Sequence, residues 1–250
     1  MDFYFIFNMI GQVAVWIYNL LHISQKTAFL GAVSQKAIEK CERRNKGIKL
    51  FVSPWFWAFL ETAVITFAQY NYVGLLNSAF GNLVGTGANY FGLMFSVPVI
   101  IFLVCLLLKI DYYKQMDMIS PAFPLGLIFV KIACFTAGCC RGVPFEYGCY
   151  NPVSGVVEFP AQLLEAVAAL GIFIFLLGVK KKLANGTVFP VYLMTYSVVR
   201  FFTEFSRCEP AVLGPLKTYQ ILCCIGVLSG FLQYVLAKEY NKKQALKKSK

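Results

Sequence analysis

The chain alternates between long apolar stretches and short polar segments. Seven apolar stretches can be recognised, at residues 3–24, 52–72, 88–108, 120–138, 161–179, 187–206 and 218–237. Most have close to the roughly 20 residues with which an α-helix crosses the hydrocarbon core of a bilayer, whereas a membrane β-strand needs only about 10. The pattern therefore predicts an all-α integral membrane protein with seven transmembrane helices.

The composition supports this prediction and excludes a soluble domain. Hydrophobic residues make up 58% of the 250 residues and charged residues only 14%, whereas a soluble domain has about a quarter of its residues charged. The first apolar stretch follows Met1-Asp2 without a basic segment or a small-residue cleavage site. We therefore expect it to be a membrane span and not a signal peptide.

The basic residues are distributed unevenly between the two sides of the predicted spans. Eighteen of the 23 lie on one side: seven at 26–49, two at 109 and 114, three at 180–182 and six from 238 onwards. The positive-inside rule then predicts an N-terminus outside and a C-terminus in the cytoplasm. The net charge of +11 is explained by this topology and by anionic head groups, without a nucleic-acid partner. We expect one transmembrane domain at 1–240, with a basic cytoplasmic loop at about 25–50, an outer-face loop at 139–160 and a lysine-rich cytoplasmic tail at 241–250.

The sixth apolar stretch carries polar residues on one predicted helix face. At 100° per residue, Tyr196, Arg200, Glu204 and Arg207 fall within about 80° of one another. An ionisable residue inside a membrane costs at least ~2.5 kcal/mol and is a candidate for function. Arg200 and Glu204 are spaced to neutralise each other, which is also compatible with an ion pair that only locks helix packing. The second arginine on the same face favours anion binding, because a guanidinium group can hold a phosphate through two hydrogen bonds.

Two further predicted spans contribute buried polar residues. The fifth begins after Pro160 and carries Gln162 and Glu165, and the fourth carries Lys131. These residues predict an outward-opening cationic pocket whose obvious anion is a phospholipid head group. Its expected members are Lys131, Glu165, Arg200, Glu204 and Arg207.

The fourth span ends in Gly138-Cys139-Cys140-Arg141-Gly142, in which the glycines favour a turn or a close helix approach. The spacing of the nine cysteines does not match a zinc site, so the favoured interpretation is small buried thiols. The one histidine, His22, lies at the end of the first span, and no Ser-His-Asp or Cys-His arrangement can be drawn around it. We therefore expect neither a metal nor a cofactor.

Three segments together resemble the prolipoprotein diacylglyceryl transferase family. The run from Asp117 through Pro121 to Lys131-Ile-Ala-Cys-Phe-Thr-Ala-Gly-Cys-Cys-Arg-Gly142 is similar to its signature region. Phe159-Pro-Ala-Gln-Leu-Leu-Glu165 resembles its His-Pro-Ser/Thr-Gln-Leu-Tyr-Glu segment. Tyr196-Ser-Val-Val-Arg-Phe-Phe-Thr-Glu-Phe-Ser-Arg207 resembles its Tyr-Gly-x-x-Arg-Phe-x-x-Glu-x-x-Arg segment. Gln220 matches a further position, so the resemblance covers roughly residues 110–225.

The resemblance implies an enzyme of the bacterial plasma membrane. Such enzymes transfer diacylglyceryl from phosphatidylglycerol to a lipobox cysteine of a preprolipoprotein and leave glycerol phosphate, without a metal. The catalytic residues it implies here are Tyr196, Lys131, Arg200 and Glu204. The implied contacts to the phospholipid head group are Cys134, Gly138, Gly142, Gln162, Glu165 and Arg207.

The chain also departs from the family pattern, which leaves alternatives open. Lys131 stands where the family usually has arginine, and Phe159 stands where it has histidine. Lys131 is expected either to contact phosphate or to act as the general base in place of the missing histidine. The alternative functions are a catalytically altered or inactive lipid-binding membrane protein and, less favoured, an anion transporter, because no inverted repeat is visible.

Overall fold

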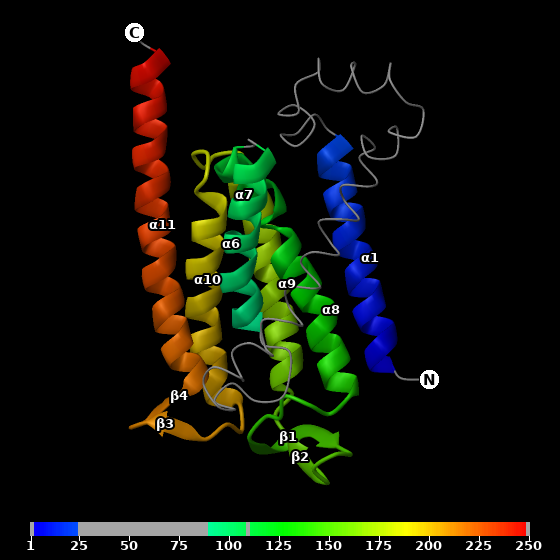
Figure 1. The fold of residues 1–250 in the computed structure, drawn as a ribbon. Helices are drawn as coiled ribbons and strands as arrows, with labels where there is room; N and C mark the ends of the chain where they lie inside the picture. Colours follow the sequence, from blue (N-terminus) through cyan, green and yellow to red (C-terminus); the bar gives the residue numbers. More distant parts are fainter. Residues whose placement is uncertain (1–2, 25–89, 109–110, 249–250) are drawn as a thin grey trace. The chain divides into compact units, whose positions relative to one another are not determined.

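A computed structural model describes residues 3–24, 90–108 and 111–248 (Figure 1). The chain divides into two compact units, one formed by Met1–Val15 with Ser120–Lys250 and the other by Trp16–Ile119. The second unit contains α6 (Tyr90–Leu108) and α7 (Tyr112–Ile119), which pack together with the Phe102 and Tyr112 rings 5.6 Å apart, edge to face. All the predicted functional residues lie between Lys131 and Arg207 and therefore belong to the first unit.

Six of the seven predicted spans coincide with helices. Besides α6, these are α1 (Phe3–Ser24), α8 (Ala122–Thr136), α9 (Ala161–Val179), α10 (Val188–Thr203) and α11 (Thr218–Lys248). Four described segments are long and apolar enough to cross a membrane: Phe3–Leu21, Tyr112–Thr136, Ala161–Val179 and Thr218–Leu246. A helical membrane protein is therefore confirmed. The predicted span at 52–72 and the predicted basic loop at about 25–50 lie outside the described residues.

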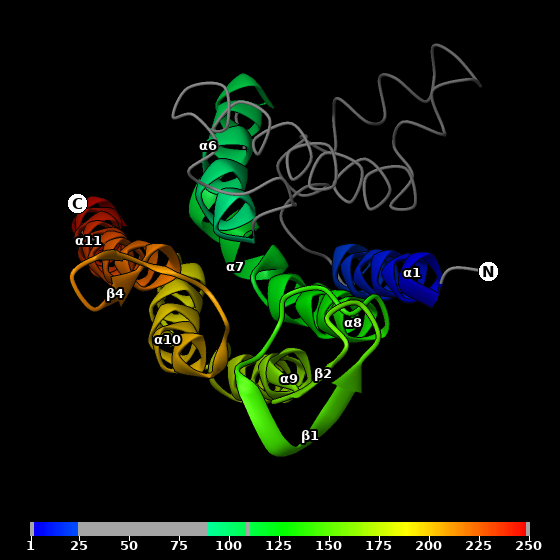
Figure 2. The same cartoon turned by 90° about the horizontal axis from the view of Figure 1, so that it is seen from below.

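The helices of the first unit follow one another as neighbours. α8 packs on α9, α9 on α10 and α10 on α11, so that helices next to each other in sequence are next to each other in space (Figure 2). α1 lies against α8, because a Cβ atom at Gly11 would approach Phe129 Cβ to 2.8 Å. Small residues of this kind allow two membrane helices to pack closely.

Two short antiparallel hairpins lie at the same end of these helices (Figure 1). β1 (Pro144–Asn151) pairs with β2 (Val156–Glu158), and β3 (Ala211–Leu213) pairs with β4 (Leu216–Lys217). The sequence predicted only a loop at 139–160. The strands are too short for their alternation of side chains to stand out against the surrounding apolar pattern.

The predicted helix over 187–206 is wrong at its C-terminal end. The α-helix stops at Thr203, η2 (Glu204–Ser206) adds a 3₁₀ turn, and Arg207 is extended with φ −103° and ψ 145°. Side-chain hydroxyl groups form hydrogen bonds to backbone carbonyl groups of this last turn. Thr203 Oγ1 donates to Arg200 O, and Ser206 Oγ donates to Thr203 O. Such bonds compete with continuation of a helix. Arg207 then forms an isolated β-bridge with Gly142.

Most of the predicted lysine-rich tail at 241–250 is helical. α11 continues without interruption from the apolar stretch to Lys248. Residues 241–248 contain mainly Lys, Gln, Ala and Leu, which are strong helix formers, and no Gly or Pro. The helix therefore has no reason to end where the hydrophobic residues end.

Gly142 is expected to be intolerant of any side chain. A Cβ atom at Gly142 would lie 1.9 Å from Phe159 O, so Gly142→Ala must displace backbone that joins two loops. We expect Gly142→Ala to destabilise the protein by about 1–3 kcal/mol, measured by thermal unfolding in detergent. The matched control is Gly171→Ala in α9, where a Cβ atom meets nothing within 4 Å and alanine favours the helix. Equal melting temperatures for the two variants would contradict this prediction.

Candidate anion-binding site

The buried carboxylate of Glu165 lies at the centre of three cationic side chains. Its Oε2 atom is 2.6 Å from Lys131 Nζ of α8. Its Oε1 atom is 3.1 Å from an Arg207 guanidinium nitrogen and 3.7 Å from one of Arg200. Three segments far apart in sequence therefore meet at one residue in the second turn of α9.

A second carboxylate, that of Glu204, completes the group. It forms an ion pair with Arg200 four residues earlier, and its Oε2 atom is 4.0 Å from Arg207 Nε. All five side chains are at most 9% exposed. We call this group, formed by Lys131, Glu165, Arg200, Glu204 and Arg207, the cationic cluster. Among the buried side chains the cations exceed the carboxylates by one. Arg207 has a further carboxylate partner at the surface, because Glu209 Oε1, on a side chain 36% exposed, is 3.3 Å from an Arg207 guanidinium nitrogen. An anion that binds here would therefore compete with Glu209 for Arg207.

The sequence predicted all five members of the cationic cluster. For Arg207, however, the argument from helical periodicity is wrong. Helical periodicity placed Arg207 on the face of Arg200, whereas Arg207 lies beyond the end of the helix. The extended backbone of Arg207, anchored by the bridge to Gly142, is what directs its guanidinium group to Glu165.

Two residues near the start of α11 support the cationic cluster and were missed as site residues. Lys217 Nζ donates hydrogen bonds to Glu204 O at 2.8 Å and to Arg207 O at 2.6 Å. The Tyr219 ring centroid is 5.1 Å from Arg200 Cζ and 5.9 Å from Arg207 Cζ, within cation–π range. Gln220 Oε1 accepts a hydrogen bond from Lys217 N, which holds the junction between β4 and α11 in place. These contacts depend on the β3–β4 hairpin, which no periodic pattern predicts.

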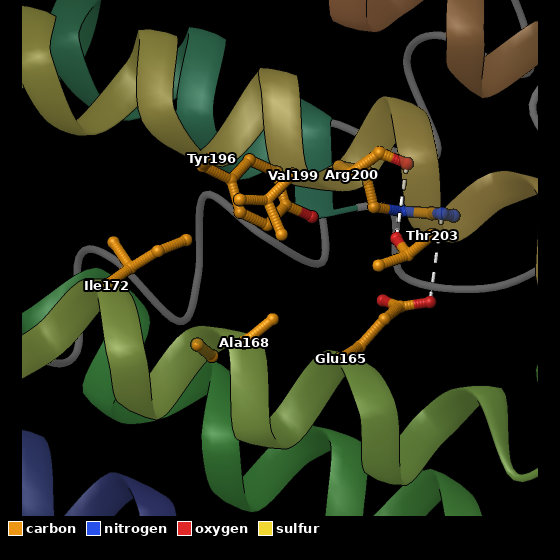
Figure 3. A pocket seen from close by; sticks show the side chains of 8 residues that line it. Glu165, Ala168, Ile172, Tyr196, Val199, Arg200 and Thr203 are labelled. Atoms are coloured by element: carbon orange, nitrogen blue, oxygen red, sulfur yellow. Dashed lines mark hydrogen bonds and ion pairs between the residues drawn. The ribbon is translucent and has the colours of Figure 1, made fainter.

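A narrow cavity between α9 and α10 leads to the cationic cluster (Figure 3). Ala168 and Ile172 form part of one wall, and Tyr196 and Val199 form part of the other. Glu165 and Arg200 face each other at the polar end of this cavity (Figure 3). The cavity has a volume of about 10 Å³, which is room for about one water molecule.

The predicted head-group contacts Gln162, Gly138 and Gly142 occupy a different place. Gln162 Nε2 donates to Cys139 O, and Asn151 Nδ2 donates to Gly138 O. Gly138 has φ +66°, a conformation that glycine adopts without strain. These residues build the turn that follows α8 and hold it against α9 and β1.

The same turn is supported by an ion pair that sequence reasoning missed. Arg141 Nε donates to Glu158 Oε1 at 2.8 Å, and Asn151 Nδ2 donates to Glu158 Oε2 at 3.1 Å. Burial of the Glu158 carboxyl opposes its ionisation, but the hydrogen bonds from Arg141 and Asn151 and the positive charge of Arg141 help to keep the pKa of Glu158 below its usual value. Glu158 therefore stabilises this loop as a carboxylate.

Three thiols meet at the end of α8. The sulfur atoms of Cys134, Cys139 and Cys140 all lie within 4.8 Å of one another. Cys134 is buried, Cys140 is half-buried and Cys139 is exposed. We call these three residues the thiol cluster. They are the residues of this site with the chemistry to hold a soft metal ion.

The fold and the cationic cluster together define a helical membrane protein with a buried group of ionised side chains near one end of its helices. Comparison with known proteins specifies the class further. Residues 5–236 match the family model of prolipoprotein diacylglyceryl transferase, and the chain belongs to this family.

Several relatives carry the name phosphatidylglycerol–prolipoprotein diacylglyceryl transferase. That of Clostridioides difficile (strain 630) is 33% identical over 135 residues, which are 54% of each chain. That of Clostridium perfringens (strain 13 / Type A), numbered 2, is 31% identical over 146 residues, or 54% of this chain and 57% of the relative. The chain thus spans little more than half the length of these relatives. The match to the Finegoldia magna protein covers 93% of this chain and 95% of the relative, at 23% identity.

Proposed function

We propose that this protein transfers diacylglyceryl from phosphatidylglycerol to the lipobox cysteine of a preprolipoprotein. The observation that carries the proposal is the cationic cluster, in which two buried arginines and a buried lysine meet at one end of the helices beside a small cavity. The membership of the chain in the transferase family and the names of its relatives support the same activity.

The proposed reaction forms one bond and breaks one. The thiolate sulfur of the acceptor cysteine attacks the glycerol carbon of the diacylglyceryl group, and a carbon–sulfur bond forms. The bond between this carbon and the phosphate oxygen breaks, and its electron pair leaves with glycerol phosphate. Arg200 and Arg207 bind the phosphate and stabilise the charge that develops on the departing oxygen. Glu204 and Tyr196 orient Arg200, while Lys131 and Glu165 hold the charge balance of the cluster.

The direct test is an assay of the purified protein with phosphatidylglycerol and a synthetic lipobox peptide, read by peptide mass. The expected result is a mass increase of one diacylglyceryl group with release of glycerol phosphate. The same peptide with serine in place of its cysteine is the control and should stay unmodified. Binding of phosphatidylglycerol without any change in peptide mass would contradict the transfer and support a lipid-binding function.

We further propose seven spans in the bacterial inner membrane, with the N-terminus outside. The proposal is supported by the basic residues at 180–182 and from 238 onwards, which follow α9 and end α11, while both hairpins lie at the opposite end of these helices (Figure 1). A membrane-impermeant thiol reagent applied to intact cells should label the exposed Cys149 and Cys208 and leave Cys41 unlabelled. Labelling of Cys41 alone would contradict this orientation.

Lys131 is expected to act as a cation that contacts phosphate. Its Nζ atom lies 2.6 Å from Glu165 Oε2, the geometry of an ammonium–carboxylate ion pair. Lys131→Arg should therefore retain at least about a tenth of the wild-type transfer rate, because the positive charge stays. Lys131→Met should lose more than this. Complete loss in Lys131→Arg, together with a changed pH profile, would instead identify Lys131 as the base.

A further inference from the structure

We propose that the thiol cluster of Cys134, Cys139 and Cys140 binds one Zn²⁺ ion and that the open fourth position of this ion takes the thiol of the acceptor cysteine. The three-cysteine site stands on the geometry of this chain alone. The assignment of the fourth position rests on the function proposed above.

The sulfur atoms are arranged closely enough for one ion. All three lie within 4.8 Å of one another, and tetrahedral Zn²⁺ with Zn–S bonds of about 2.3 Å places its sulfur ligands about 3.8 Å apart. Small rotations of the three cysteine side chains would bring the sulfur–sulfur distances from at most 4.8 Å to about 3.8 Å. Three protein ligands and one open position are the pattern of catalytic zinc sites, whereas structural sites have four protein ligands.

The backbone is shaped to bring the thiols together. Gly138 and Cys140 both have positive φ values, +66° and 58°, and Cys140 is the one described non-glycine residue with a positive φ. A side chain in this left-handed region is disfavoured and persists where surrounding contacts impose it. Here the contacts are hydrogen bonds from Asn151 to Gly138 O and from Gln162 to Cys139 O. Cys139 N also donates to Cys134 O, which closes the turn.

The charges around the thiol cluster match a metal–thiolate centre. Zn²⁺ with three thiolates has one net negative charge. The positive charges of Arg207 and Lys131 act on the Cys140 thiol, and that of Lys131 also acts on Cys134 and Cys139. The same arginine belongs to the cationic cluster, so a sulfur bound at the fourth position would lie beside the proposed phosphate site.

The ion would also supply something that this part of the chain lacks. Residues 25–250 contain no histidine, and a cysteine thiol is mostly protonated at neutral pH. On binding Zn²⁺, the acceptor thiol gives its proton to water and becomes a thiolate. That thiolate then attacks the glycerol carbon, the carbon–sulfur bond forms, and glycerol phosphate leaves with the electron pair of the broken carbon–oxygen bond.

Metal binding can be measured without turnover. We expect the purified, reduced full chain to bind one equivalent of Co²⁺ with thiolate-to-cobalt charge-transfer absorption, and Zn²⁺ to displace it. Cys139→Ser, at an exposed position where folding is least at risk, should weaken Co²⁺ binding at least about 100-fold. Cys134→Ser and Cys140→Ser should do the same. Cys149→Ser and Cys208→Ser remove exposed thiols outside the thiol cluster and should leave the affinity for Co²⁺ unchanged. Equal Co²⁺ binding by all five variants, or none by the wild type, would overturn the site.

The fourth position is tested with the lipobox peptide. Adding the peptide to the Co²⁺ form should change the charge-transfer bands as a fourth thiolate binds, whereas the serine peptide should leave them unchanged. Identical spectra with both peptides would overturn the assignment of this position.

The transfer assay separates this inference from the proposed function. Full transfer by Cys139→Ser in the presence of a chelator would overturn the inference while the proposed function stands. A Co²⁺ site that responds to the cysteine peptide in a protein without transfer activity would support the inference as a thiol-binding centre and overturn the proposed function.

Discussion

Replacing Arg200 by alanine is expected to reduce diacylglyceryl transfer at least about 100-fold, the usual cost of removing a preorganised donor from a developing charge. Arg200 lies between Glu165 and Glu204 and forms the polar end of the cavity between α9 and α10. Arg200→Lys should recover little of the activity, because an ammonium group cannot hold a phosphate through two parallel hydrogen bonds. The measurement is the rate of mass change of the lipobox peptide.

The Arg200 variants must be compared at equal amounts of folded protein. Arg200→Ala leaves two buried carboxylates with one cation fewer, so that protein level and melting temperature are needed beside the rate. Arg200→Lys preserves the charge and is the variant that separates folding from catalysis. Lys242→Ala, which removes an exposed cation of α11, is the control and should retain full activity. A folded Arg200→Lys protein with the wild-type rate would contradict a two-point contact to phosphate.

The largest effect on stability is expected for Glu165→Gln. Glu165 contacts Lys131, Arg200 and Arg207. Its loss leaves these three buried cations with the buried carboxylate of Glu204 and the more exposed carboxylate of Glu209. Breaking a buried ion pair in this way costs about 3–5 kcal/mol. We therefore expect a large decrease in the melting temperature of the purified protein, whereas Glu239→Gln on the exposed face of α11 should change stability by less than about 0.5 kcal/mol.

A second substitution tests the cause of this loss. Lys131→Met in the Glu165→Gln background removes the cation closest to the lost carboxylate. The double variant should regain part of the stability, with a coupling of about 0.5–3 kcal/mol between the two positions. Purely additive effects of the two substitutions would argue against an electrostatic origin.

The helical architecture and the five residues of the cationic cluster were predictable because both come from strong local signals. Each described span is a long apolar stretch, and a charged residue within such a stretch needs a partner. Glu165 is an example: its position inside an apolar helix predicted that it balances cations from other helices. The number of cations that it contacts depends on helix packing and is not contained in any local pattern.

The parts that were missed depend on backbone geometry outside regular helices. Lys217 and Tyr219 reach the cationic cluster because the β3–β4 hairpin returns the chain to it. The spacing of the cysteines matches no zinc pattern and predicts only small buried thiols, whereas the structure brings Cys134, Cys139 and Cys140 together. Their proximity results from the positive φ values at Gly138 and Cys140. For a non-glycine residue such as Cys140, the sequence gives no sign of this conformation.

The uninterrupted course of α11 makes this helix a fixed spacer at the membrane surface. Its 31 residues extend about 46 Å at ~1.5 Å per residue, and even at a tilt of about 40° they rise about 35 Å, more than the roughly 30 Å hydrocarbon core. The twenty residues up to Ala237 match the core, so the excess is the basic part from Lys238 onwards. A flexible tail would let these lysines collapse onto anionic lipids. On a rigid helix, each lysine instead has a set height above the bilayer and a set direction around the axis.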